Sequence, residues 1–316
     1  CMEEIIQAVD RKLLKSELTP DKFLRKTNKG GNEIYITTAK DSPNIMLELA
    51  RLRELSFRSA GGGSGKSLDM DEFDTMECPY KQLFVWDPDS EEIIGGYRYI
   101  MANDIKLSEN GQPHLATAEM YYFTDNFIKN YLPYMIELGR SFVQPDYQSS
   151  KKGAKSLFAL DNIWDGLGAL LVKNPNLKYF FGKVTVYQHY NSTARDMIFG
   201  FLRKYFPDHE NLVYPVDPFE ISFTPKQIDN LFNAPTYKEN FHILNREVRA
   251  LGVNIPPLVN AYMGLSPNMS SFGFAVYHEF GELIECCIMI PIDQMYEEKK
   301  QRHITTFLEG PENKTV

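Results

Sequence analysis

Tyr134-Met-Ile-Glu-Leu-Gly-Arg-Ser-Phe-Val-Gln-Pro-Asp-Tyr-Gln148 begins as an apolar run with β-branched and aromatic residues and stops at a proline. This pattern predicts a short interior strand that ends in a turn. Two charged residues, Glu137 and Arg140, stand inside it. Buried charge is costly unless it is paired or used. Because the two residues are three apart, a regular strand would point them to opposite faces, one toward a cleft and one bracing the wall behind. A structural ion pair is the other interpretation.

The segments after this strand predict the fold class. Residues 154–173 carry apolar residues at helical spacing, Tyr179–Val186 is strongly β-prone, and Ser192–Tyr205 again has helical periodicity. The order strand, helix, strand, helix implies at least one parallel strand pair and hence an α/β (α+β) fold.

The rest of the chain predicts further elements on both sides of this core. We expect a polar helical segment over residues 1–29 and a helix over 43–57, begun by Ser42 as its cap and by Pro43. A long loop is expected over 59–79. Further strands are expected at 33–38, 82–87, 92–100, 272–280 and 283–290, with a strand or a turn of helix at 118–124 and helices at 225–232 and 237–251.

Composition limits the class of protein. The chain has 316 residues, of which 43% are hydrophobic and 24% are charged, as in an ordinary globular protein. We find no membrane-spanning run and no signal peptide, and the four cysteines have no metal spacing, so we expect a cytoplasmic protein without a metal. The formal net charge of −8 argues against nucleic acid as a partner. The oligomeric state cannot be predicted.

Two loop motifs allow alternative interpretations. Ala60-Gly-Gly-Gly-Ser-Gly-Lys-Ser67 matches the loose form of a phosphate-binding loop. However, a helix precedes it and the acidic run Asp69-Met-Asp-Glu-Phe-Asp74 follows, so a mobile loop is the stronger expectation. The acidic run is interpreted either as a solvated loop or as a lip that binds an amine.

Four short motifs occur in an order typical of one family. They are Arg53-Glu-Leu-Ser-Phe57, Asp69-x-Asp71-x-Phe73-Asp74, Gly95-Gly-Tyr-Arg98 and Glu137-Leu-Gly-Arg140. In this order they resemble the acyl-homoserine-lactone synthases and the ornithine-lipid-type (hemolysin-like) N-acyltransferases, and residues 137–147 are closer to the second group. The resemblance covers about residues 33–190, with Ile255–Tyr262 as a looser extension. It departs at the glycine-rich loop and at Asp69, where glutamate is common in the family.

The resemblance implies a GNAT-type acyltransferase fold, with a central mixed twisted sheet, helices on both faces and a C-terminal extension. The whole of 1–316 would then be one acyltransferase domain, made of an N-terminal helical segment (1–29), a GNAT-like core (30–205) and an extension that completes the sheet (206–316). The usual GNAT pyrophosphate loop is absent, and Lys151–Lys155 stands in its place. We therefore expect no bound cofactor and an acyl carrier protein, with its phosphopantetheine thioester, as the donor.

The implied reaction is transfer of a long-chain fatty acyl group, with or without a 3-hydroxyl group, to the amine of a small amino acid of the ornithine or glycine type. The amine must lose a proton before it attacks, and a carboxylate accepts such a proton well. Glu137 is the expected base, Arg140 accompanies it, and the backbone N–H groups near Phe142 and Val143 are the expected oxyanion donors. The other expected site residues are Arg53, Phe57, Asp69, Asp71, Asp74 and Arg98 for the acceptor, Tyr97, Tyr99, Trp164 and Phe180 for the acyl chain, and Lys151, Lys152, Lys155 and Arg195 for the carrier.

Two other functions fit the same residues. One is an N-acetyltransferase that uses acyl- or acetyl-coenzyme A, and the other is a catalytically inactive GNAT-like binding module. A hydrophobic product also suggests peripheral contact with the inner face of the membrane.

Overall fold

Two compact units make up the computed structural model, which describes residues 1–148 and 154–308, with side chains at 154–158 left out. Unit 1 comprises Cys1–Ile105, Tyr134–Lys178 and Glu297–Val316, and unit 2 comprises Lys106–Pro133 and Tyr179–Tyr296. The chain therefore passes between the units several times, and each unit is described separately.

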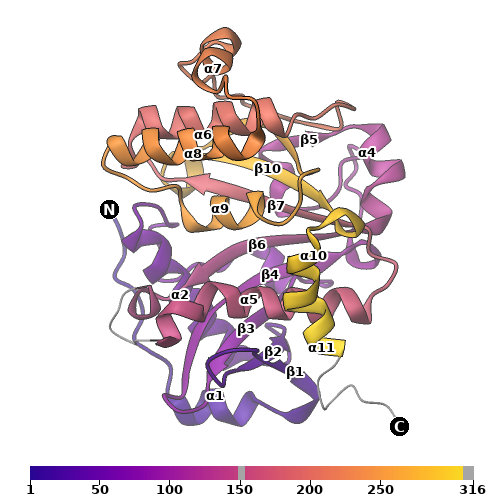
Figure 1. Cartoon of the computed structure of the whole chain (residues 1–316). Helices are drawn as coiled ribbons and strands as arrows, with labels where there is room; N and C mark the ends of the chain where they lie inside the picture. The colour runs from indigo at the N-terminus through magenta and orange to yellow at the C-terminus, as the bar shows by residue number, and fades with distance from the viewer. Residues whose placement is uncertain (149–153, 309–316) are drawn as a thin grey trace. The chain divides into compact units, whose positions relative to one another are not determined.

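Unit 1 is built on an antiparallel sheet with the strand order β1-β2-β3-β4-β6 (Figure 1). The strands are β1 (Phe23–Lys26), β2 (Glu33–Thr37), β3 (Lys81–Asp87), β4 (Glu92–Met101) and β6 (Met135–Val143). The helices are α1 (Arg11–Glu17), α2 (Pro43–Ser59), α3 (Glu72–Thr75), α5 (Ala154–Lys173), α10 (Glu297–Lys300) and α11 (Thr306–Leu308).

Helices α2 and α5 cover opposite faces of this sheet. Gln82 and Leu83 are adjacent on β3, so their side chains point to opposite sides. Gln82 meets Arg53 of α2, whereas a Cβ added to Gly166 of α5 would lie 2.8 Å from the Leu83 side chain. The glycine lets α5 approach the sheet closely, and the C-terminal helices, yellow in Figure 1, lie along α5.

Strand β6 is not regular, which corrects the prediction that Glu137 and Arg140 face opposite sides. Arg140 has a positive φ of 52°, and the pairing of β6 with β4 shifts register between Gly96 and Arg98. This β-bulge inserts one residue and resets the alternation of side chains. Glu137 and Arg140 therefore both face α2 and the loop that follows it.

The N-terminal prediction was wrong in part. Only Arg11–Glu17 is α-helical within residues 1–29, and Phe23–Lys26 forms the edge strand β1. Ser42 does occupy the N-cap position of α2, but its hydroxyl donates to Asp41 and makes no cap to the helix. The expected loop at 59–79 contains the short helix α3.

Unit 2 has a second antiparallel arrangement, β7-β10-β9, and a small ribbon of β5 and β8. Its strands are β5 (Tyr121–Phe123), β7 (Tyr179–Val186), β8 (Val213–Pro215), β9 (Ser270–Tyr277) and β10 (Leu283–Pro291). Its helices are α4 (Asp125–Asn130), α6 (Ser192–Tyr205), α7 (Pro225–Leu231), α8 (Tyr237–Ala250) and α9 (Pro257–Met263).

Aromatic side chains form the core of unit 2 on both sides of β7. Phe180 packs on Tyr262 of α9, with ring centroids 5.5 Å apart, and the next residue, Phe181, packs on Phe123 and Phe127. Adjacent strand residues point to opposite faces, so α9 and the β5–α4 segment cover different sides of β7. Among the described residues, no helix is both long enough and apolar enough to cross a membrane.

Candidate active site

A buried ion cluster joins α2 to the acidic loop and to β3. Arg53 lies on the inner face of α2, where its Nη1 is 3.2 Å and 3.1 Å from the two carboxylate oxygens of Asp74. Its Nη2 donates to Gln82 on β3, whose amide in turn donates to Asp74 over 2.8 Å. Because Nη1 contacts the carboxylate and Nη2 contacts the amide, the guanidinium is fixed in orientation as well as paired in charge. Both charged side chains are almost fully buried, so the pair ties the loop to the core.

Arg98 of β4 binds the same loop from the sheet. Its Nη1 and Nη2 donate to the two oxygens of Asp71 over 2.6 Å and 2.9 Å, and Nη1 also lies 3.1 Å from Asp74. The guanidinium carbon lies over the rings of Phe73 and Tyr80, 5.7 Å and 5.1 Å from their centroids, and the two rings pack edge to face on each other. Burial opposes the charge of Arg98, but Asp74 and Asp71 outweigh that effect and raise its pKa.

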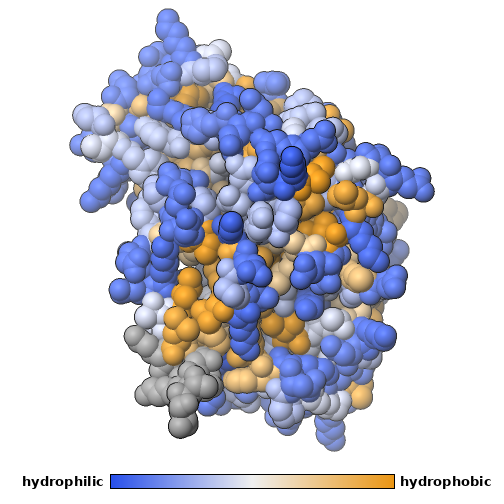
Figure 2. Space-filling view, turned by 90° about the vertical axis from the view of Figure 1, so that its right-hand side faces the viewer, coloured by the Kyte–Doolittle hydropathy of each residue, from blue (hydrophilic) through white to orange (hydrophobic). Residues whose placement is uncertain are grey.

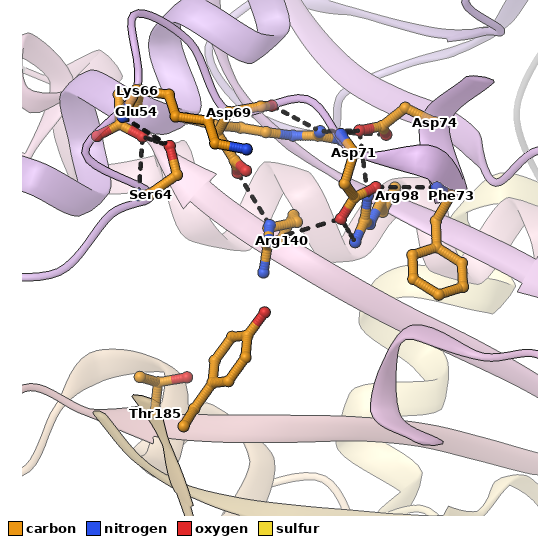
Figure 3. Close-up of polar contacts among 12 residues, drawn as sticks. Glu54, Ser64, Lys66, Asp69, Asp71, Phe73, Asp74, Arg98, Arg140 and Thr185 are labelled. Atoms are coloured by element: carbon orange, nitrogen blue, oxygen red, sulfur yellow. Dashed lines mark hydrogen bonds and ion pairs between the residues drawn. The ribbon is translucent and has the colours of Figure 1, made fainter. Parts of the chain in front are cut away.

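Arg140 contributes the third guanidinium, from the bulge of β6 (Figure 3). Its Nε is 2.9 Å from Asp69, and its Nη2 is 3.6 Å from Asp71. The structure thus brings together six of the predicted residues, which are Arg53, Asp69, Asp71, Asp74, Arg98 and Arg140. The solvated-loop interpretation is wrong, because Asp69 and Asp74 are buried.

Asp71 and Asp74 remain ionised because their partners oppose the cost of burial. Burial raises the pKa of Asp71 and Asp74, but Arg98 outweighs it at Asp71, and Arg53 and Arg98 outweigh it at Asp74, so both pKa values are lowered. A capping box at α3 adds backbone donors to the same two carboxylates. Of the three aspartates, only Asp71 reaches solvent appreciably, with 32% of its side chain exposed. Asp71 is therefore the carboxylate that an incoming cation can contact.

Glu137 lies on β6 near this cluster and is buried. The Tyr80 hydroxyl donates to its Oε1 over 3.0 Å, and the Tyr80 ring stacks under Arg98. Phe142 and Val143, farther along β6, stand opposite Gly96 and Gly95 of β4. Their predicted role as oxyanion donors remains a prediction.

The remaining predicted residues lie apart from the ion cluster. Phe57 is buried one turn after Arg53 on α2. Tyr97 and Tyr99 point to the α5 side of the sheet, Trp164 is buried on α5, and Phe180 belongs to unit 2. The acyl-chain assignment therefore remains a prediction.

The predicted carrier-docking lysines are described only in part. Lys151 and Lys152 lie outside the described residues, and Lys155 belongs to α5 without a described side chain. Arg195 of α6 is engaged by Asp196 at 2.9 Å and lies over the ring of Phe219. The docking role of these residues also remains a prediction.

Sequence reasoning missed Glu54, which organises the glycine-rich loop. Its carboxylate is fully buried and accepts hydrogen bonds from Ser64 N (2.9 Å), Ser64 Oγ (2.5 Å) and Gly65 N (3.3 Å), and from Arg58 Nε at 3.0 Å. The loop N–H groups that would cradle a phosphate are thus used by a carboxylate of the same chain. The one available signal was the four-residue spacing of Glu54 and Arg58, which is common on helix surfaces.

Sequence reasoning also missed Tyr80 and Gln82, and in unit 2 the pair Lys183–Glu285, 3.0 Å apart on β7 and β10. Within residues 1–148 and 154–308, no group of three or more His, Cys, Asp or Glu side chains is placed to hold a metal ion.

Comparison with known proteins identifies the family. Residues 52–157 match the model of an acetyltransferase (GNAT) domain. The chain is 57% identical to a glycine N(alpha)-acyltransferase of Bacteroides thetaiotaomicron over 98% of this chain and 92% of that protein. It is 55% identical to a glycine N(alpha)-acyltransferase of Phocaeicola vulgatus over 97% of this chain and 94% of that protein.

Among solved structures, FeeM, an N-acyl amino acid synthase from uncultured soil microbes, aligns with 89% of this chain and 100% of its own at 8% identity and a TM-score of 0.38. A resemblance at that score adds nothing to the assignment. The two long, close sequence matches and the domain match confirm the predicted GNAT-type fold and the predicted acyltransferase activity. The chain therefore belongs to the GNAT-fold N-acyltransferase family that includes these two glycine N(alpha)-acyltransferases.

Proposed function

We propose that this protein transfers a fatty acyl group from the phosphopantetheine thioester of acyl carrier protein to the amine of glycine. The observation that carries the choice of glycine is the identity of 57% with a glycine N(alpha)-acyltransferase across 98% of the chain. The site supports an amine acceptor, because Asp71 offers a partly exposed carboxylate that Arg98 keeps ionised. The carrier-protein donor rests on the sequence alone, where Lys151–Lys155 replaces the pyrophosphate loop.

In the proposed reaction, the glycine ammonium binds beside Asp71 and gives up one proton to a base, for which we propose Glu137. The free amine then attacks the thioester carbonyl carbon, and a C–N bond forms. The carbonyl oxygen becomes an oxyanion, for which backbone N–H groups near Phe142 and Val143 are the proposed donors. Collapse of the tetrahedral intermediate breaks the C–S bond, the second amine proton passes to the leaving thiolate, and the carrier thiol and an N-acylglycine are released.

Glu137 lies in a suitable position for a general base, but its side chain is buried and does not reach solvent directly. Its carboxylate is buried and fixed by the Tyr80 hydroxyl, which holds one oxygen and leaves the group oriented by the strand. A base acts only within hydrogen-bond reach of the proton or through one water molecule. Proton transfer through the Tyr80 hydroxyl or through a water molecule meets that requirement. If Glu137 has only a structural role, no such proton route is needed.

The test is an assay of the purified chain with long-chain acyl carrier protein, with and without a 3-hydroxyl group, and an equimolar pool of amino acids and ornithine. Mass spectrometry of the products should show N-acylglycine in excess over every other product. An equal rate with acyl-coenzyme A alone would overturn the carrier donor, and a dominant product other than N-acylglycine would overturn the acceptor.

Glu137→Gln separates the two roles of Glu137. If Glu137 is the base, kcat should fall by about 10²-fold or more, while the thermal midpoint changes little, because the amide still accepts from Tyr80. Tyr80→Phe removes the hydrogen bond but keeps the carboxylate, and it tests the route of the proton: kcat should fall if the proton passes through the Tyr80 hydroxyl and stay near the wild-type value if it passes through water. Reduced stability with unchanged kcat in Glu137→Gln would assign Glu137 a structural role.

A further inference from the structure

Lys66 is the cation near the ion cluster that the structure leaves uncommitted. The three guanidinium groups contact Asp69, Asp71 and Asp74 and are nearly buried. By contrast, the Lys66 side chain is exposed, and its ammonium makes no hydrogen bond or ion pair with any described residue. The predicted use of Arg53 and Arg98 to hold an acceptor carboxylate is therefore not favoured, since the acidic loop already binds both.

The backbone at Lys66 is firmly placed, although its side chain is free. Lys66 N donates to Ser64 Oγ over 3.2 Å, and its carbonyl accepts from Arg58 Nη2 over 2.7 Å. Ser64 and Arg58 are both held by the buried carboxylate of Glu54. The N-terminal segment pairs with the other side of the loop, through Glu3 N to the Gly65 carbonyl and Ile6 N to the Ser67 carbonyl.

The loop also directs Lys66 toward the cluster. Lys66 precedes Asp69 by three residues, and Asp69 N is anchored to the Ala50 carbonyl of α2. In Figure 3 the extended Lys66 side chain runs from the Ser64 end of the loop toward Asp69. A fixed backbone with a free ammonium is an arrangement suited to an anionic ligand, because only the side chain, and not the loop, has to be ordered on binding.

We infer that Lys66 binds the carboxylate of the acceptor amino acid, while Asp71 binds its ammonium group. This inference rests on the proposed function and extends it to recognition of both charges of the substrate. Glycine has no side chain, so the amine and the carboxylate are its only polar handles. An ammonium on one side and a carboxylate on the other would distinguish amino acids from simple amines and from amino acid amides.

The experiment compares glycine with glycinamide, which keeps the amine and lacks the negative charge. In Lys66→Met, KM for glycine should rise about tenfold or more, as expected for loss of one charge-assisted contact, with kcat and KM for the acyl donor nearly unchanged. The preference for glycine over glycinamide should fall by the same factor. Lys66→Arg should keep KM for glycine and the preference for glycine over glycinamide close to their wild-type values.

Lys81→Met is the matched control, because Lys81 is an exposed lysine at the start of β3, next to Gln82 but on the opposite face. It should leave both acceptors unaffected. An unchanged KM for glycine in Lys66→Met would overturn the inference while N-acylglycine formation still supports the proposed function. If the assay shows that another amino acid is the acceptor, the same comparison is made with that amino acid and its amide. An acceptor that has no carboxylate would overturn the inference.

Discussion

Asp74 is the residue on which the buried cluster converges. Arg53, Arg98 and the Gln82 amide all contact its carboxylate, and the N–H of Asp71 donates to it over 3.1 Å. These groups come from α2, β4, β3 and the acidic loop, so one carboxylate joins four separate segments. A buried carboxylate with this many partners is expensive to disturb, because each cation left behind is itself buried.

Replacing Asp74 by asparagine should therefore be severely destabilising. Removal of one member of a buried ion pair costs about 3–5 kcal/mol, chiefly because the remaining charge lacks compensation. Chemical denaturation at pH 7 should show a loss of that size. Asp146→Asn, an exposed aspartate of unit 1, should shift the free energy of unfolding by no more than about 0.5 kcal/mol.

The acid limb of the same experiment tests the ionisation of Asp74. Its pKa is lower in the folded state than in the unfolded state, so its stabilisation is present above the ordinary value of 3.8 and is lost as pH falls through the folded pKa. Between pH 4.5 and pH 2.5 the wild-type protein should lose stability more steeply than Asp74→Asn. Parallel slopes would show that Asp74 does not carry the lowered pKa.

At this scale the sequence predicted the cluster but not what supports it. Arg53, Asp71 and Arg98 were found because a family resemblance marks them as motif residues. Glu54 was not found, because its role depends on a loop that returns to the same helix, and no local pattern shows that return. A glutamate four residues before an arginine is an ordinary stabilising pair on helix surfaces and implies no such function.

At the scale of elements, the bulge in β6 and the glycine-rich loop place the site. The bulge depends on the positive φ of Arg140, a conformation that a non-glycine residue adopts only where its surroundings hold it. Regular alternation was the only expectation that the sequence allowed. The predicted bounds of the more regular strand at 179–186 were correct, because its apolar and β-branched residues decide them locally. The extended N-terminal segment was missed because its conformation depends on pairing with the distant residues 65–67.

Two glycines of the loop offer a matched test of its geometry. Gly63 and Gly65 both have positive φ, at 98° and 76°. A Cβ on Gly63 would lie 2.7 Å from Glu54 Oε2, whereas a Cβ on Gly65 would have no neighbouring atom within 4 Å. Gly65→Ala should cost about 1 kcal/mol from backbone strain alone. Gly63→Ala should cost more and should raise KM for glycine, because it displaces the carboxylate that fixes the loop.

Thermal unfolding and acceptor kinetics measure both effects. If the two variants behaved alike in stability and in KM, contact with Glu54 would have no part in placing the loop. Glu54→Gln is a useful third variant, since it keeps the shape of the side chain but weakens the hydrogen bonds from Ser64 and Gly65.

For the whole molecule, the charge balance creates a problem for the proposed donor. The chain has a formal net charge of −8, and acyl carrier proteins are acidic, so the two repel at long range. Productive docking then requires a local basic surface, for which Lys151, Lys152, Lys155 and Arg195 remain the proposed residues.

Figure 2 shows hydrophobic patches between hydrophilic residues on one face of the molecule. The predicted contact with the membrane remains a prediction.

The dependence of the kinetics on ionic strength should reveal whether overall repulsion or local attraction by the basic residues controls the binding of acyl carrier protein. If the basic residues guide docking, added salt should lower kcat/KM for acyl carrier protein several-fold between 20 mM and 300 mM NaCl, through KM. Replacing Lys151, Lys152 and Lys155 together by alanine should abolish that dependence. A short acyl thioester without the carrier is the control, and its kinetics should be nearly independent of salt. A rise in kcat/KM with salt would mean that overall repulsion dominates.

The buried carboxylate at the base of the glycine-rich loop also bears on how related sequences are interpreted. A search for nucleotide-binding motifs would select residues 60–67, yet the Glu54 carboxylate already accepts the hydrogen bonds of Ser64 and Gly65 in that loop. Because that carboxylate belongs to the same chain, we expect ATP or GTP at cellular concentrations to compete poorly with it. Homologues that keep a glutamate six residues before this loop should therefore not be classified as ATPases or kinases on the motif alone.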